Sequence, residues 1–151
     1  MKVLGIDLGS RAVKIVMTHD GIIEVSKIFD TASFYREYCT RSQDGIRVDM
    51  GRLGIGGFDR VCSTGYGRNN VRVEGAEVIT ELRAHMEGAV WQAGLRDFTL
   101  LDVGGQDSKV IQIINGKMAD IMLNDKCAAA CGRYLENMAA VLGISVDRLG
   151  E

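Results

Sequence analysis

Two short stretches of the sequence, "GIDLGSRAVK" and "LLDVGGQDSK", place an acid and a glycine at the end of an apolar run. In each stretch, Asp7 or Asp102 is followed by one apolar residue and a glycine, and Lys14 or Lys109 comes after the turn. Backbone N–H groups of glycine turns can bind phosphate, and an adjacent carboxylate can hold Mg²⁺ through water. One such turn is typical of an ordinary hairpin. Two of them favour a nucleotide phosphate site.

β-Hairpins must position these turns. The apolar, β-prone residues 2–30 predict three antiparallel strands, the last two joined at Asp20-Gly21, a strong hairpin signal. Residues 98–114 predict a second hairpin around Asp102, followed by a turn at Asn115-Gly116 and a strand over 118–122. No GxxxxGK[ST] stretch occurs, so neither turn is a P-loop.

Helical spacing predicts three helices. They cover residues 31–41 with Thr31 or Ser33 as N-cap, residues 76–93 with Gly94 as C-cap, and residues 127–142. Residues 58–69 predict a short strand that ends in a glycine turn, the polar stretch 42–57 predicts no clear element, and Gly54–Gly57 predicts a loop. This order of elements predicts an α/β fold of the ribonuclease H-like kind, a mixed sheet with helices on both faces.

Length and composition are those of an ordinary globular domain: 151 residues, 46% hydrophobic and 25% charged. The net charge of -2 gives no electrostatic reason to expect nucleic acid or an anionic membrane as partner. No apolar run approaches the roughly 20 residues that cross a bilayer, and no signal peptide is evident, so a cytoplasmic location is expected. The four cysteines do not suggest a disulfide framework.

Four stretches together carry a family resemblance: "DVGGQDSKV", "STGYGRN", "ITELRAH" and "NDKCAAACGRYLENMA". They resemble the ATP-dependent activators of 2-hydroxyacyl-CoA dehydratases and the related ATPase subunits of benzoyl-CoA reductase, a branch of the actin, hexokinase and acetate-kinase superfamily. The resemblance runs from Val3 to about Leu142. It implies one half of an actin-like ATPase fold, with residues 1–151 as an N-terminal half-domain. Family members carry a second domain that this sequence does not reach, so the chain is expected to be either an isolated N-terminal domain or a naturally short relative. The chain alone is not expected to hydrolyse ATP.

The resemblance implies an ATPase that passes a low-potential electron through a [4Fe–4S] cluster, shared between two subunits, to an acyl-CoA dehydratase or reductase. A ferredoxin or flavodoxin would donate the electron, and the full-length protein would be a homodimer. Asp7 and Asp102 would manage Mg²⁺ through water. The residues expected to contact ATP phosphates are Gly9, Ser10, Lys14, Gly104, Gly105, Gln106, Asp107 and Lys109.

A further acid and two cysteines are candidate site residues. Glu81 lies four residues before His85 on one predicted helix, so the two could form a surface pair, or His85 could be hydrogen-bonded within the domain. Alternatively, Glu81 positions the attacking water, since the superfamily places a polar residue there. Asn124 or Asp125 can cap the last helix, which puts Cys127 in its first turn, where the helix dipole favours the thiolate that iron binds. The family cysteine at this position ligates the cluster. Cys131, where the family usually continues Gly-Thr-Gly with no cysteine, is either a core thiol or a substitute second ligand.

Two other functions stay open at this point. A small-molecule kinase of the same superfamily would need a substrate pocket and no cluster, and anaerobic purification without the brown colour of a cluster would favour it. A non-catalytic, nucleotide-binding half-domain would lack an adenine site in the whole gene.

Overall fold

A computed structural model of the protein describes residues 1–43, 45–104, 107–124 and 132–150. The chain divides into two compact units, Met1–Ala84 and His85–Glu151. The assignment of residues 1–151 to one N-terminal half-domain stays a prediction.

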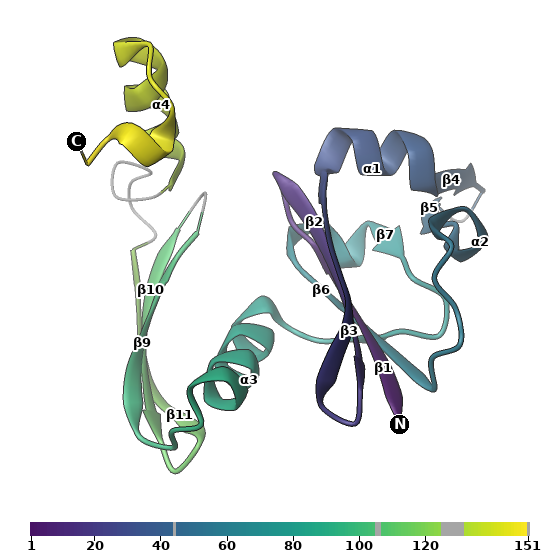
Figure 1. Ribbon diagram of the computed structural model, residues 1–151, viewed down its shortest axis with the longest axis horizontal. Coiled ribbons are helices and arrows are strands. Elements are labelled where there is room, and N and C mark those ends of the chain that lie inside the picture. The colour runs from purple at the N-terminus through teal and green to yellow at the C-terminus, as the bar shows by residue number, and fades with distance from the viewer. Residues whose placement is uncertain (44, 105–106, 125–131, 151) are drawn as a thin grey trace. The chain divides into compact units, whose positions relative to one another are not determined.

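The first unit is built on a five-stranded mixed sheet of order β3-β2-β1-β6-β8 (Figure 1). Its first three strands, β1 (Lys2–Leu8), β2 (Ala12–His19) and β3 (Ile22–Asp30), form the predicted antiparallel meander. The turn between β2 and β3 places Asp20 and Gly21 at φ values of 49° and 82°, the left-handed backbone of a two-residue hairpin turn. β6 (Arg60–Thr64) and β8 (Glu77–Val78) then extend the sheet in parallel.

One face of this sheet is the core of the first unit. Leu4, Ile6 and Leu8 of β1 alternate inward and are almost wholly buried, as are Val13 and Ile15 of β2. Helix α1 (Thr31–Tyr38) contributes the buried ring of Phe34 to the same core. Because side chains alternate between faces along a strand, Asp7 and Lys14 lie on the opposite face.

The α1 helix differs from the prediction at both ends. Its N-cap is Asp30, whose carboxylate accepts a hydrogen bond from Ser33 N at 2.9 Å, so the predicted Thr31 or Ser33 cap is wrong. The helix ends at Tyr38, short of residue 41, because Cys39–Ser42 form strand β4. β4 pairs with β5 (Gly45–Val48), which in turn pairs with β7 (Val71–Arg72) in a small separate sheet.

Short elements fill the region between β5 and β8. Helix α2 (Met50–Leu53) follows β5 in the stretch where the sequence predicted no clear element, and residues 54–57 are turn and loop as predicted. The predicted strand and glycine turn are confirmed as β6, Gly65 and a 3₁₀ helix η1 (Tyr66–Asn69).

The second predicted helix, over residues 76–93, also begins later than predicted. Helix α3 spans Glu81–Ala93 and does not begin at residue 76, because Glu77 and Val78 pair with β6 at the sheet edge. Gly94, at a φ of 63°, donates its N–H to Val90 O and ends the helix as predicted. No helix in the described part of the chain is long and apolar enough to cross a membrane.

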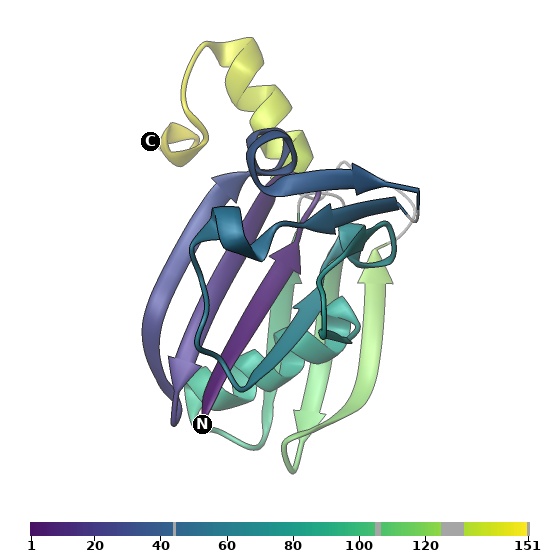
Figure 2. The ribbon, with the colours of Figure 1, turned by 90° about the vertical axis from the view of Figure 1, so that its right-hand side faces the viewer.

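The second unit holds a three-stranded antiparallel sheet, β9 (Phe98–Val103), β10 (Ser108–Ile114) and β11 (Lys117–Asn124). Figure 2 shows these strands side by side. The turn between β10 and β11 again uses two left-handed residues, Asn115 and Gly116. Helix α4 (Gly132–Leu142) and a 3₁₀ helix η3 (Val146–Arg148) follow; residues 127–131 of the predicted last helix lie outside the described residues.

The β1–β2–β3 and β9–β10–β11 meanders share one register. Asp7 lies opposite Lys14 across the first hairpin, and Asp102 lies opposite Lys109 across the second. The register shift in each following pair falls at the equivalent place, after Met17 in β2 and after Gln112 in β10. The two turns that the sequence singled out therefore sit on equivalent backbone frames.

The Asp30 cap generates a pH-dependent stability prediction. Hydrogen bonding from the Ser33 N–H holds the pKa of the Asp30 carboxyl below its usual value. A carboxyl whose pKa is lower in the folded state stabilises the fold above its unfolded pKa, and this stabilisation is lost as the pH falls through the folded pKa. Asp30→Ala should therefore lower the denaturation midpoint at pH 7, and the difference from the parent chain should shrink below about pH 4. Asp30→Asn keeps a capping oxygen without a charge and should show a smaller loss; a loss as large at pH 3 as at pH 7 would contradict the assignment.

Candidate functional site

The first glycine turn joins β1 to β2 and is closed by Gly9. A Cβ on Gly9 would lie 2.5 Å from Ala12 O, so no side chain fits at this position. The turn is also held from outside, because Thr31 Oγ1 donates a hydrogen bond to Gly9 O at 2.8 Å. Ser10 is exposed at the tip of the turn.

Asp7 is held at the base of this turn by the lysine opposite it. Lys14 Nζ lies 3.0 Å from Asp7 Oδ2, and the Asp7 side chain is 19% exposed. The other carboxylate oxygen, Asp7 Oδ1, is buried and has no hydrogen-bond partner. A buried carboxylate oxygen without a partner is costly, which makes it a suitable acceptor for a metal-bound water.

Gly65, directly after β6, packs against the same carboxylate. Its φ is +91°, and a Cβ there would lie 2.7 Å and 2.8 Å from the Leu8 backbone C and N, and closer still to Asp7 Oδ1. A glycine at this position therefore lets the chain after β6 approach Asp7.

The second glycine turn is closed by its own backbone and side chains. Gly104 N donates to Asp107 O at 2.8 Å. Lys109 Nζ, which is almost buried, lies 2.7 Å from Asp107 Oδ1 and 3.5 Å from Asp102 Oδ2. Gly104 O accepts a hydrogen bond from Gly132 N, at the start of α4, at 2.9 Å. Gly105 and Gln106 lie outside the described residues.

His85 is hydrogen-bonded within its unit, one of the alternatives that the sequence left open, and its partner is Asp102. Its Nδ1 lies 2.7 Å from Asp102 Oδ2, and both side chains are largely sheltered from solvent. An ionised carboxylate only accepts hydrogen bonds, so Nδ1 carries the proton. The sequence paired His85 with Glu81 by helical spacing alone; no pattern in the chain connects His85 to Asp102, which is distant in sequence.

The remaining predicted site residues are Glu81 and the two cysteines of the last predicted helix. Glu81 is half-buried at the first position of α3, and its role with water stays a prediction. Cys127 and Cys131 lie outside the described residues. Cys39 lies in β4, where burial raises the pKa of its thiol to about 11.

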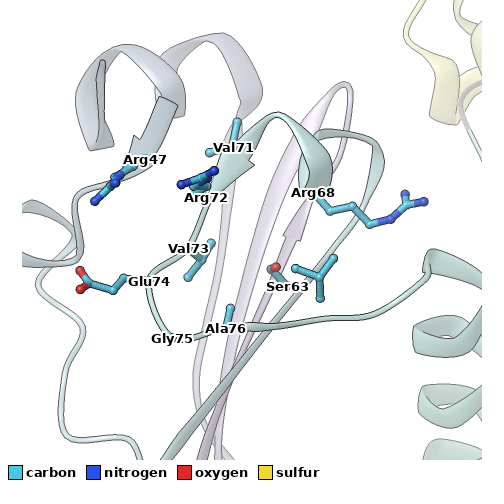
Figure 3. A pocket seen from close by; sticks show the side chains of 10 residues that line it. Arg47, Ser63, Arg68, Val71, Arg72, Val73, Glu74, Gly75 and Ala76 are labelled. Carbon is cyan, nitrogen blue, oxygen red and sulfur yellow. The ribbon is translucent and has the colours of Figure 1, made fainter. Parts of the chain in front are cut away.

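A separate hollow of about 350 Å³ lies beside β6 in the first unit (Figure 3). Three arginines line it, two of them, Arg47 and Arg72, close together in the figure. The third, Arg68, extends away from them and donates through Nη1 to Gly65 O at 3.0 Å. Ser63 borders this hollow. Thr64, the next residue of β6, lies on the opposite face of the sheet, which carries Asp7.

Similar solved structures define the class of fold. An activator of the 2-hydroxyisocaproyl-CoA dehydratase from Clostridium difficile, solved with bound ADPNP, superposes with a TM-score of 0.75 at 30% identity. The match covers 99% of this chain and 55% of that one. The predicted α/β fold of the ribonuclease H-like kind, one half of an actin-like ATPase fold, is confirmed.

Residues 4–151 match the model of the BadF/BadG/BcrA/BcrD ATPase family, and the chain belongs to this family. It is 35% identical over 150 residues to the (R)-2-hydroxyglutaryl-CoA dehydratase activating ATPase of Acidaminococcus fermentans, covering 98% of this chain and 56% of the relative. It is 33% identical over 154 residues to the 2-hydroxyisocaproyl-CoA dehydratase activator of Clostridioides difficile, covering 99% and 56%. The resemblance seen in the sequence is thus confirmed, and the chain spans just over half the length of these relatives.

Gly65 offers a direct test of the approach to Asp7. Gly65→Ala should destabilise the protein more than Gly57→Ala, a matched change at a φ of +73° with nothing within 4 Å of the added Cβ. Gly57→Ala measures only backbone strain, about 1 kcal/mol, and the clash at Gly65 should add about 1–3 kcal/mol. Urea denaturation of both variants gives the comparison. Equal losses would mean that Gly65 does not pack against the Asp7 carboxylate.

Proposed function

We propose that this chain is the nucleotide-binding part of an ATPase that activates an acyl-CoA dehydratase or reductase. Membership of an ATPase family supports the first half of this proposal. The second half is supported by relatives that are named as activators of 2-hydroxyglutaryl-CoA and 2-hydroxyisocaproyl-CoA dehydratases. The full-length protein would transfer a low-potential electron to its partner enzyme through an iron–sulfur cluster.

The observation that carries the proposal is the repeated Asp–Lys register at two glycine turns. In each unit a carboxylate is aligned by a lysine beside a turn where glycine is packed against backbone. The partnerless Asp7 Oδ1 suits a hydrated Mg²⁺, because Mg²⁺ keeps several waters and takes few protein ligands.

Each predicted residue has a proposed role in ATP binding. Asp7 and Asp102 would orient Mg²⁺ through its waters, and the backbone of Gly9, Ser10 and Gly104 would meet the phosphates, with Gly105 and Gln106. Lys14 is half-exposed and can also reach a phosphate. Lys109 is already bound by two carboxylates, so we assign it to the orientation of Asp102 and Asp107.

The cysteine assignment rests on the family resemblance, and thiol chemistry is consistent with it. Iron is bound by thiolate, and a thiol whose pKa is about 11, as for Cys39, is protonated at neutral pH. Cys127 follows Asn124 and Asp125, which suits a helix start, where thiolate is favoured. We therefore propose Cys127 as the cluster ligand, in a homodimer that shares the cluster and accepts electrons from a ferredoxin or flavodoxin. The cluster would supply one-electron transfer.

The second turn generates a test of hydrolysis. In the full-length protein, Asp102→Ala should lower the rate of ATP hydrolysis about a hundredfold or more, because it removes the carboxylate that manages the charge of Mg²⁺. Asp7→Ala should act in the same way. Asp120→Asn, which removes an exposed charge from β11 of the same sheet, is the control and should hydrolyse normally. Hydrolysis within a few-fold of normal in Asp102→Ala, with the protein folded by circular dichroism, would make the turn structural only.

The cysteines generate a test of the cluster. Cys127→Ser should lose iron and dimer stability together, since one shared centre holds both subunits. Iron analysis after anaerobic purification and analytical ultracentrifugation measure the two effects. Cys39→Ser should change neither, and Cys131→Ser should keep its iron. A Cys127→Ser protein with full iron content and a stable dimer would end the electron-transfer proposal.

A further inference from the structure

Thr64, the last residue of β6, carries a buried hydroxyl that bonds to nothing in the described part of the chain. Its side chain is 8% exposed, and Thr64 Oγ1 has no hydrogen-bond partner. Among the described residues, one other buried side-chain oxygen or nitrogen shares this property: Asp7 Oδ1. Most buried polar atoms in proteins are hydrogen-bonded, so two exceptions call for a common explanation.

The two atoms belong to neighbouring residues on one face of the sheet. β1 and β6 run parallel, and Asp7 pairs directly with Thr64 in their register. Lys14 lies opposite Asp7 on the other side, so the carboxylate sits between a lysine and a threonine. Lys14 binds Oδ2, which leaves Oδ1 as the carboxylate oxygen without a partner.

The backbone after Thr64 brings this hydroxyl and the first glycine turn together. Gly65 passes against Asp7 and Leu8 more closely than any side chain would allow. Arg68 holds that backbone in place through its hydrogen bond to Gly65 O. The end of β6 is thereby fixed beside the turn that Asp7 and Gly9 form.

The chemistry of the two oxygens identifies the group that would satisfy them. A carboxylate oxygen only accepts hydrogen bonds, whereas a hydroxyl both donates and accepts. A water on a divalent cation donates two strong hydrogen bonds, which matches a pair of acceptors on one face. A phosphate oxygen alone would satisfy the hydroxyl but would repel the carboxylate.

We propose that Thr64 Oγ1 is a ligand-binding group of the nucleotide site and, with Asp7 Oδ1, binds a water on the Mg²⁺ of a bound nucleoside triphosphate. This inference rests on the proposed function, in which the first turn binds Mg²⁺–ATP. It assigns a role to the "STG" segment, which the sequence singled out only by resemblance.

The test compares Thr64→Val with Thr64→Ser in the full-length protein. Valine keeps the shape and the β-branching of threonine without its hydroxyl, and serine keeps the hydroxyl. Thr64→Val should weaken Mg²⁺–ATP binding about tenfold by calorimetry, as expected for a lost hydrogen bond to a charged group, and Thr64→Ser should stay within about twofold. Without nucleotide, the melting temperature of Thr64→Val should not fall, because a hydroxyl that has no partner stabilises nothing.

Ser63→Ala is the matched control, since Ser63 is also buried, lies on the opposite face of β6 and should leave binding unchanged. A lower melting temperature with unchanged affinity in Thr64→Val would overturn the proposal and make the hydroxyl structural. An equal loss of affinity for ATP in EDTA would also overturn it, because the contact would then not involve the metal. Asp7→Asn distinguishes a failure of this inference from a failure of the proposed nucleotide site. If Asp7→Asn weakens Mg²⁺–ATP binding and Thr64→Val does not, only the role of Thr64 is wrong. If neither variant changes the affinity, the proposed site at the first turn fails as well.

Discussion

The cross-strand pairing of an aspartate with a lysine, once in each unit, is the constraint on which both glycine turns depend. Directly opposite positions of an antiparallel pair lie close enough for their side chains to interact. The lysine therefore fixes which way the carboxylate points at the last positions before the turn. A slip of one residue in either register would send the aspartate to the other face of the sheet and leave the turn without its acid.

The two Asp–Lys pairs have the same register but differ in their exposure to solvent. Lys14 is 54% exposed, whereas Lys109 is 9% exposed and touches two carboxylates. The core residues of β2 lie on the face away from Lys14, but the buried Ile111 and Ile113 of β10 share the face of Lys109. One hairpin thus presents its ion pair at an open face, and the other encloses it.

This difference marks the limit of what the sequence could predict. The strands of the two hairpins and their two-residue turns follow from alternation and from Asp-Gly and Asn-Gly signals, and the structure has them near the predicted positions. The pairing of each aspartate with a lysine was not predicted, because it depends on the cross-strand register. Which face each hairpin buries depends on helices packed from elsewhere in the chain. The alternation of side chains along a strand does not predict which face that is. The contact of His85 with Asp102 is of the same kind, because it joins a helix to a strand 17 residues away. The predicted helix start at residue 76 was wrong for a related reason. The apolar side chain of Val78 fits both a helical period and a strand at the sheet edge.

The second turn also connects Asp102 to the start of helix α4. Asp102 binds Lys109, Lys109 binds Asp107, and Asp107 O holds Gly104 N. On its other side Gly104 accepts the N–H of Gly132, where α4 begins. The lysine contacts are 3.5 Å to Asp102 and 2.7 Å to Asp107, and Lys109 is almost buried, so these contacts are little screened by solvent. If Asp102 holds Mg²⁺ as proposed, the loss of a γ-phosphate and its metal would change the charge beside Asp102. Lys109 would then bind its two carboxylates differently, and the turn could shift. Because α4 begins at Gly132, which is bonded to this turn, such a shift would reach α4.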